Sequence, residues 1–239
     1  MFVLIHSPLV GPGTWQPVAQ ELRREKYEVA VPELQDNEDV RVAYWQQHAE
    51  SVRRALSAVP VDRRLILAGH SGAGPLLPVI RQSLRHQIDA YMFVDAGIPQ
   101  RGASRLDQIA AESPDWFQSF SAFLAEGGRF PDWRDEDLLE EIPDQTLRHS
   151  LLAELRPRAL PFWEESIPVF EGWPDAPCAY LHFSAAYNGP AAVARDRGWS
   201  YIHLPGGHFL LMVDPQIVAR GLISMLPDLG IDQTNLNEA

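Results

Sequence analysis

The sequence has little cysteine, little positive charge and no long apolar run. Its single cysteine, Cys178, cannot form an internal disulfide or a cysteine-rich metal site. Lys and Arg number 20 against 32 Asp and Glu, and the resulting net charge of −12 disfavours binding to nucleic-acid phosphates or to anionic lipid. No apolar run approaches the ~20 residues of a membrane-spanning helix. We therefore expect no nucleic-acid partner and no membrane partner.

The start of the sequence lacks the features of a secretory signal. An apolar run begins directly after Met1, with neither a basic stretch nor the apolar core of a signal peptide before it. Together with the single cysteine, this predicts a reducing, cytoplasmic setting. Histidines and carboxylates do not cluster with ligand spacing, so we expect no metal and no organic cofactor. With 239 residues, 46% hydrophobic and 22% charged, the composition is that of a globular protein with one or two domains.

Six short apolar runs have the length of β-strands. Most are apolar throughout, which is typical of strands covered on both faces. Segments between several runs, such as 42–59, have helical spacing of their apolar residues. Strands that alternate with helices predict an α/β fold with a mostly parallel open sheet and helices on both faces. The runs are Phe2–His6, Glu28–Val31, Leu65–Gly69, Tyr91–Val94, Ala179–Phe183 and Tyr201–Leu204.

The alternation is interrupted between residues 97 and 177, where no strand-like run occurs and aromatic residues accumulate. We expect a helical cap at 98–176, inserted into an α/β core formed by 1–97 and 177–239. The aromatic side chains of this cap either fill its own core or line a pocket, and both can hold at once. Trp116, Trp133 and Trp163 are the candidates for contact with a substrate.

A serine lies at an expected sharp turn. The segment 69–74, GHSGAG, follows the third apolar run and precedes helix-compatible sequence. A nucleophile on a strained strand-to-helix turn needs small residues two positions away on either side, because a larger side chain collides with backbone. Gly69 and Ala73 meet this requirement, so Ser71 is a candidate nucleophile. A glycine-rich turn with an incidental serine is the plainer alternative, and the glycines match neither a dinucleotide nor a phosphate loop.

A serine hydroxyl needs a base within hydrogen-bond distance to act as a nucleophile. His208 follows the last apolar run, and Gly206 and Gly207 before it allow the loop to fold back over the sheet edge. Other histidines are expected to be solvated in helices or buried within strands. The helical ones are His48, His86 and His149, and those in strands are His182 and His203. His208 is therefore the candidate base.

Three motifs resemble those of the α/β-hydrolase family. They are His6-Ser7-Pro8 with Trp15 after the first strand, the turn around Ser71, and Gly207-His208 near the C-terminus. The resemblance spans nearly the whole chain, including a helical insertion where that family places a cap. The chain resembles a compact member of the family that lacks the first two strands. It implies the order serine, acid, histidine, and the hydrolysis of a carboxylic ester or thioester through a serine nucleophile.

The acid departs from the usual pattern of that family. It usually follows the strand before the histidine loop, where this chain has 184–188, SAAYN, without a carboxylate. Asp95 ends the preceding strand, next to the expected serine strand, and some members of the family place their acid there. Asp95 is therefore the candidate that accepts the imidazole N–H of His208. The alternatives are that Asp95 caps a segment or holds a turn; Asp196 is better explained as a solvated charge. Tyr187 is a further candidate for substrate contact.

Pro8 is a second departure. The family takes one oxyanion N–H from the second residue after the histidine of this loop, and proline has no N–H to donate. The resemblance implies that Gly72 provides one donor. Leu9 is the candidate for the other, with Val10 and the Ser7 hydroxyl as alternatives.

The missing amide keeps three classes of function open. The first is hydrolysis of an ester or thioester of a small apolar or aromatic organic substrate. The second is lyase, dehydratase or cyclase chemistry, in which Ser71 and His208 only transfer protons. The third is ligand binding without catalysis. In each case the aromatic cap favours an apolar or flat small molecule as the partner.

Overall fold

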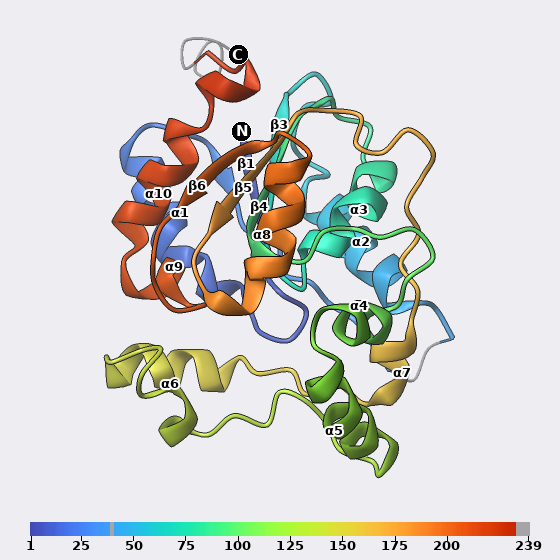
Figure 1. The fold of residues 1–239 in the computed structure, drawn as a ribbon. Coiled ribbons are helices and arrows are strands. Elements are labelled where there is room, and N and C mark those ends of the chain that lie inside the picture. Colours follow the sequence, from blue (N-terminus) through green and yellow to red (C-terminus); the bar gives the residue numbers. More distant parts are fainter. Residues whose placement is uncertain (39–40, 233–239) are drawn as a thin grey trace.

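The computed structural model describes residues 1–38 and 41–232. Within them, six parallel strands form one sheet in the order β2-β1-β3-β4-β5-β6 (Figure 1). The strands are β1 (Phe2–Ile5), β2 (Val29–Ala30), β3 (Leu65–Ser71), β4 (Ile88–Ala96), β5 (Cys178–His182) and β6 (Ser200–His203). Each of the six apolar runs contributes one strand, which confirms the predicted α/β class and the parallel sheet.

Helices cover both faces of the sheet, as predicted, because consecutive strand side chains point to opposite sides and nearly all are apolar. In β1, Phe2 and Leu4 pack into one core cluster, and Val3 and Ile5 pack into the other. The first cluster includes residues of α1 (Gln16–Arg24), α9 (Leu210–Val213) and α10 (Pro215–Ser224), and the second includes α2 (Tyr44–Ala55), α3 (Leu77–Ser83) and α8 (Asn188–Asp196).

Residues 97–177, between β4 and β5, form a helical segment that is called the insertion below. Figure 1 shows its helices together below the sheet and its flanking helices. They are α4 (Arg105–Glu112), α5 (Pro114–Ala125), α6 (Gln145–Ala153) and α7 (Leu160–Glu164). The Ser104 hydroxyl accepts the N–H of Asp107 and so caps α4, and Pro114 occupies the first position of α5. The predicted cap limits, 98–176, stay a prediction, and 233–239 of the predicted core lie outside the described residues.

Short 3₁₀ helices complete the described elements: η1 (Pro12–Thr14), η2 (Gly74–Leu76), η3 (Asp135–Leu138), η4 (Ala185–Tyr187) and η5 (Pro227–Leu229). Among the residues that the structure describes, no helix is long and apolar enough to cross a membrane.

A buried ion pair joins the insertion to the core. The guanidinium of Arg158 donates to both carboxylate oxygens of Asp36, at 2.6 and 2.7 Å, and to the carbonyl oxygen of Pro8, at 2.9 Å. Both charged side chains are about 5% exposed. Burial raises the pKa of Asp36, but hydrogen bonds from His48 and Arg158 outweigh it and hold the pKa well below its usual range. Breaking such a pair by removing one partner leaves an uncompensated buried charge.

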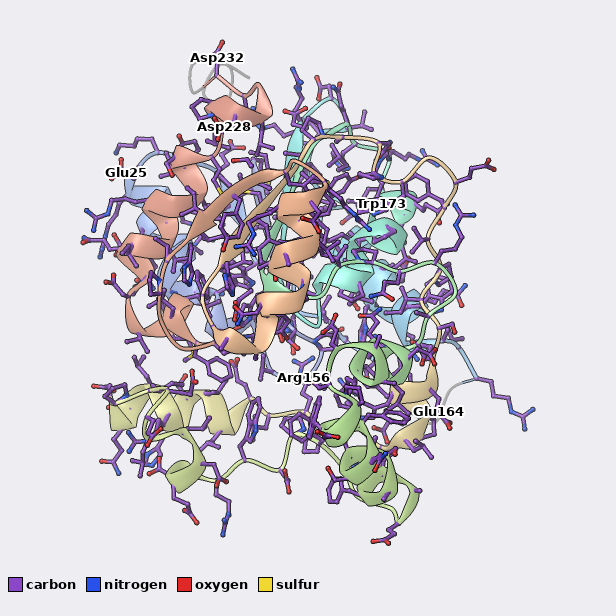
Figure 2. The ribbon with its side chains drawn as sticks, in the orientation of Figure 1. Glu25, Arg156, Glu164, Trp173, Asp228 and Asp232 are labelled. Atoms are coloured by element: carbon purple, nitrogen blue, oxygen red, sulfur yellow. The ribbon has the colours of Figure 1, made fainter. Side chains whose placement is uncertain are left out.

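A second set of contacts lies beside this pair. Figure 2 shows Arg156 where the insertion meets the core. Its N–H donates to the carbonyl of Leu9 at 2.9 Å, and its guanidinium donates to Glu33 at 2.7 Å. The insertion is therefore attached to the loop after β1 by two nearby residues of one segment.

The histidine placements predicted from the sequence were partly wrong. His48 and His86 are buried, whereas surface positions were expected. His48 faces inward from α2 and contacts Asp36 through Nε2 at 2.8 Å. His203 is exposed, whereas a core position was expected, because β6 is the edge strand of the sheet. The expectations for His149, exposed, and His182, buried in β5, are confirmed.

Candidate active site

Ser71 ends β3 in a strained turn. Its φ of 57° lies in the left-handed region that residues with a side chain rarely adopt. A Cβ on Gly69 would lie 3.2 Å from the carbonyl group of Ala73, and one on Gly74 would lie 2.1 Å from the carbonyl oxygen of Gly97. The turn therefore admits only small residues around the serine, and it presents Ser71 at the carboxyl end of β3, where ligands of parallel sheets bind.

Asp95 is the penultimate residue of the neighbouring strand, β4, and is fully buried. Its Oδ2 accepts a hydrogen bond from Nδ1 of His208 at 2.7 Å and one from the Ser184 hydroxyl at 2.6 Å. Its Oδ1 accepts the N–H groups of Phe183 and Ser184, at 2.9 and 3.0 Å. Burial raises the pKa of Asp95, but the hydrogen bond and charge of His208, with those other donors, lower it by more, so the pKa lies below its ordinary value.

The charge of Asp95 determines the tautomer of His208. An ionised carboxylate only accepts hydrogen bonds, so Nδ1 of His208 carries the proton and Nε2 is left as a lone-pair base. The structure thus places Asp95 within the hydrogen-bond distance expected for the acid of a triad. It does not place Asp196, Glu33 or Asp214 there: Glu33 pairs with Arg156, and Asp214 caps α10.

Two aromatic rings stack on the His208 imidazole. The His70 ring lies 4.5 Å away, centroid to centroid, at 26°, and the Tyr187 ring lies 5.0 Å away at 12°. Nε2 of His70 also donates to the carbonyl oxygen of His208 at 3.1 Å. Burial lowers the pKa of His70 to about 3, so this imidazole is neutral. The ring and the main chain of His208 are therefore both held in place.

Tyr187 lies directly against the candidate nucleophile. Its hydroxyl is 3.0 Å from Oγ of Ser71, and within the described part of the chain it is the hydrogen-bond partner of that oxygen, in place of His208. Tyr187 ends η4, which follows β5. The sequence suggested Tyr187 as a substrate contact but not this hydrogen bond, since nothing in its spacing relates residue 187 to residue 71.

The loop after β1 is a tight turn. The N–H of Val10 donates to the carbonyl of Ser7 at 3.1 Å, which puts Pro8 and Leu9 at its two central positions. The Leu9 N–H points to Oγ of Ser7 at a long 3.4 Å. That same Oγ lies 3.2 Å from where a Cβ of Gly72 would be, so Gly72 and this turn are neighbours. The predicted donors, Gly72 and Leu9, therefore belong to one small region beside Ser71.

The three candidate tryptophans occupy different environments. Trp133 contacts Phe209, the residue after His208, edge to face at 5.7 Å. Trp163 is buried in an aromatic cluster of the insertion against which Leu9 packs. Trp116 is 44% exposed. Their contact with a substrate stays a prediction.

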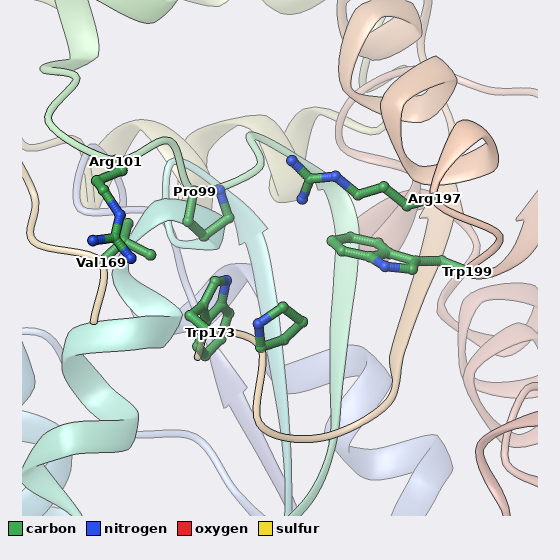
Figure 3. A pocket seen from close by; sticks show the side chains of 7 residues that line it. Pro99, Arg101, Val169, Trp173, Arg197 and Trp199 are labelled. Carbon is green, nitrogen blue, oxygen red and sulfur yellow. The ribbon is translucent and has the colours of Figure 1, made fainter. Parts of the chain in front are cut away.

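A separate hollow of about 470 Å³ lies away from these residues (Figure 3). Figure 3 shows Arg101 on one side and Arg197 on the other, with Trp199 beneath Arg197 and Trp173 below Pro99. Its lining consists of Pro99, Arg101, Val169, Trp173, Pro174, Arg197 and Trp199. Because neither Ser71, Asp95 nor His208 lines it, this hollow is not the candidate active site.

Solved structures share this architecture over almost the entire chain. An extracellular α/β-hydrolase from a Paenibacillus species, described as a structural and functional homologue of tobacco salicylic acid binding protein 2, superposes with a TM-score of 0.75, covering 93% of this chain and 97% of that one at 22% identity. The chain has the α/β-hydrolase fold. No family model and no curated protein sequence matches it.

Other α/β-hydrolase-fold structures match nearly as well. Tomato methylketone synthase I complexed with 2-tridecanone has a TM-score of 0.70 at 12% identity, with 95% of this chain and 98% of that one covered. Polyneuridine aldehyde esterase has a TM-score of 0.69 at 16% identity, with 94% and 98% covered. At such identities the likeness shows the fold alone, so the chemistry of this α/β-hydrolase-fold chain has to be argued from its own residues.

Proposed function

We propose that this protein is a serine hydrolase that cleaves a carboxylic ester or thioester of a small apolar or aromatic organic substrate. The observation that carries the proposal is the 2.7 Å hydrogen bond between buried Asp95 and Nδ1 of His208, at the sheet edge where the strained turn presents Ser71. A buried carboxylate that fixes the imidazole tautomer and stabilises the imidazolium is what a serine nucleophile requires.

In the proposed reaction, the Ser71 hydroxyl leaves Tyr187 and gives its proton to Nε2 of His208 as Oγ attacks the carbonyl carbon. The tetrahedral intermediate collapses, and the imidazolium of His208 returns the proton to the departing alcohol or thiol. His208 then takes a proton from water, which attacks the acyl-serine; the bond between the acyl carbon and Oγ breaks, and His208 returns the proton to Ser71 as the carboxylic acid leaves. Throughout, Asp95 stays ionised and stabilises the imidazolium. The N–H of Gly72 is the first proposed oxyanion donor and the N–H of Leu9 the second.

One observation favours a different chemistry on the same residues. Pro8 offers no N–H at the place where the fold usually has an oxyanion donor. A lyase, dehydratase or cyclase that only transfers protons through Ser71 and His208 forms no acyl-serine and has less need of that donor. A protein that only binds its ligand needs none.

Covalent labelling distinguishes these classes. We expect a fluorophosphonate probe to add one adduct to the wild-type protein, detected by intact mass, and p-nitrophenyl esters to be hydrolysed. Ser71→Ala should lose both, with turnover reduced by orders of magnitude. Ser224→Ala, at the end of α10, is the matched control and should keep both. A wild-type protein that neither forms the adduct nor hydrolyses the esters contradicts the proposal and favours the other two classes.

A further inference from the structure

We propose that Tyr187 is a catalytic residue whose phenolic O–H donates a hydrogen bond to the oxyanion that forms on the substrate carbonyl. It thereby compensates for the N–H that Pro8 removes. The inference rests on the serine-hydrolase function proposed above and assigns this residue a part in stabilising its transition state.

The position of the Tyr187 hydroxyl suits this part. It lies 3.0 Å from Oγ of Ser71. In the tetrahedral intermediate, the carbonyl carbon is bonded to that Oγ, and the oxyanion is only one further bond away. A donor already in hydrogen-bond contact with the nucleophile is therefore within reach of the oxyanion, at the roughly 2.7–3.1 Å that such donors require. When Ser71 gives its proton to His208 and bonds to carbon, the phenol loses its resting partner and gains the oxyanion as a stronger acceptor.

The Tyr187 ring is held in place before the substrate arrives. It stacks nearly parallel on the His208 imidazole, at 12° and 5.0 Å between centroids. Tyr187 is the last residue of η4, the 3₁₀ helix that begins directly after the two residues whose N–H groups bind Asp95. A donor fixed in this way needs little reorganisation during the reaction, and that is the condition for a large electrostatic contribution to catalysis.

The protonation state of Tyr187 also suits a donor. Burial raises the pKa of Tyr187, and the negative charges of Asp95 and Glu112 raise it further, although the hydrogen bond with Ser71 lowers it in part. The phenol therefore keeps its proton at neutral pH and can donate it to a hydrogen bond.

The loop after β1 has few main-chain N–H groups that could bind an oxyanion. Pro8 has no N–H, and the N–H of Leu9 is directed at Oγ of Ser7, at 3.4 Å. Of the proposed main-chain pair, Gly72 and Leu9, the Leu9 N–H would therefore have to turn away from Ser7 to reach the oxyanion. The loss of one oxyanion donor typically lowers kcat about 10²–10³-fold. A hydroxyl that takes the place of the missing Pro8 N–H would therefore restore a contribution of that size.

The test compares two variants of the wild-type protein, each of which lacks one tyrosine hydroxyl. Tyr187→Phe removes the hydroxyl and keeps the ring that stacks on His208. Tyr91→Phe is the matched control, since its hydroxyl bonds Asp175 and takes no part in the site. We expect Tyr187→Phe to lower kcat for a p-nitrophenyl ester about 10²–10³-fold with little change in KM, and Tyr91→Phe to leave both near wild type.

A transition-state mimic gives an independent readout. A trifluoromethyl ketone adds to the serine as an anionic hemiketal, so its affinity should fall in Tyr187→Phe by about the same factor as kcat/KM. The affinity for the product carboxylic acid should change little. A residue with a merely structural part would lower both affinities together, and thermal unfolding of the two variants reports any such damage.

The outcomes separate this inference from the proposed function. Wild-type protein without ester turnover overturns both. Turnover that disappears in Ser71→Ala but is retained in Tyr187→Phe overturns this inference alone. Faster turnover in Tyr187→Phe also overturns it, because that result would mean that the phenol blocks the serine.

Discussion

Nε2 of His70 donates a hydrogen bond to the carbonyl oxygen of His208 at 3.1 Å. His70 is the residue directly before Ser71, so this bond joins the turn that carries the candidate nucleophile to the loop that carries the candidate base. The two rings also stack, with centroids 4.5 Å apart. The distance between Ser71 and His208 is therefore controlled by a contact one residue away from the serine.

We expect substitutions of His70 to lower activity according to whether they retain a donor. His70→Leu removes the N–H, and a hydrogen bond of ordinary net strength corresponds to a fall in kcat/KM of about 10-fold. His70→Gln can place an amide N–H near the lost Nε2 and should retain more activity. Ester hydrolysis by the two variants is measured at a temperature at which thermal unfolding shows both to be fully folded. Equal activity of the two would show that the hydrogen bond does not position His208.

Asp95→Asn is expected to lower kcat about 10⁴-fold while the fold persists. The amide oxygen would take the place of Oδ1, where the N–H groups of Phe183 and Ser184 donate, and its NH₂ would face Nδ1 of His208. Nδ1 must then accept, so the proton moves to Nε2 and the base is lost. The control is Ser184→Ala, which removes one donor and keeps the charge, and its effect should be much smaller. Full activity of Asp95→Asn would exclude Asp95 as the acid.

The stability of the protein should fall as the pH decreases below 6.5. Burial lowers the pKa of His6 and of His70 to about 3, and that of His48 to about 4, from an ordinary value of 6.5. Between pH 6.5 and about 4 the unfolded chain binds protons at these residues and the folded chain does not, so falling pH favours unfolding. Each histidine contributes up to about 1.4 kcal/mol per pH unit.

Denaturant unfolding between pH 5 and 6.5 checks this dependence, above the range where the depressed carboxylates titrate. His70→Gln should reduce the slope of unfolding free energy against pH by about one histidine's share. His149→Gln, at an exposed side chain, is the control and should leave the slope unchanged. A slope near zero in the wild-type protein would contradict the prediction.

Of the candidate aromatic residues, Trp133 is expected to influence substrate binding most. It contacts Phe209, next to the candidate base, whereas Trp116 is 44% exposed. Trp133→Ala should raise KM for a p-nitrophenyl hexanoate about 10-fold relative to the acetate, because the longer acyl chain loses apolar contact. Trp116→Ala should change this ratio little. Equal effects of the two substitutions would contradict a pocket wall at Trp133.

The strands and the candidate acid could be predicted because their signals are local. Each strand contains or overlaps a short apolar run, and Asp95 directly follows the run Tyr91–Val94 in β4. The packing partners of Tyr187 and His48 could not be predicted. The hydrogen bond between Tyr187 and Ser71 spans 116 positions, and buried His48 is paired with Asp36 of a loop 12 positions away. Such contacts depend on how the loops fold over the sheet, and loop conformation cannot be predicted from periodicity or composition.

Arg158 belongs to the insertion, yet its guanidinium donates to the carbonyl of Pro8, in the turn beside the candidate nucleophile. A chimaera that received a foreign insertion without an equivalent arginine would leave the buried Asp36 without its cation, with only the hydrogen bond from His48, and would free the turn after β1. The insertion, which we propose lines the substrate pocket, and the core segment that we propose carries the chemistry are thus not interchangeable modules. A redesign of this insertion for another substrate therefore has to keep the Arg158 cation, because the same side chain supports the turn beside Ser71.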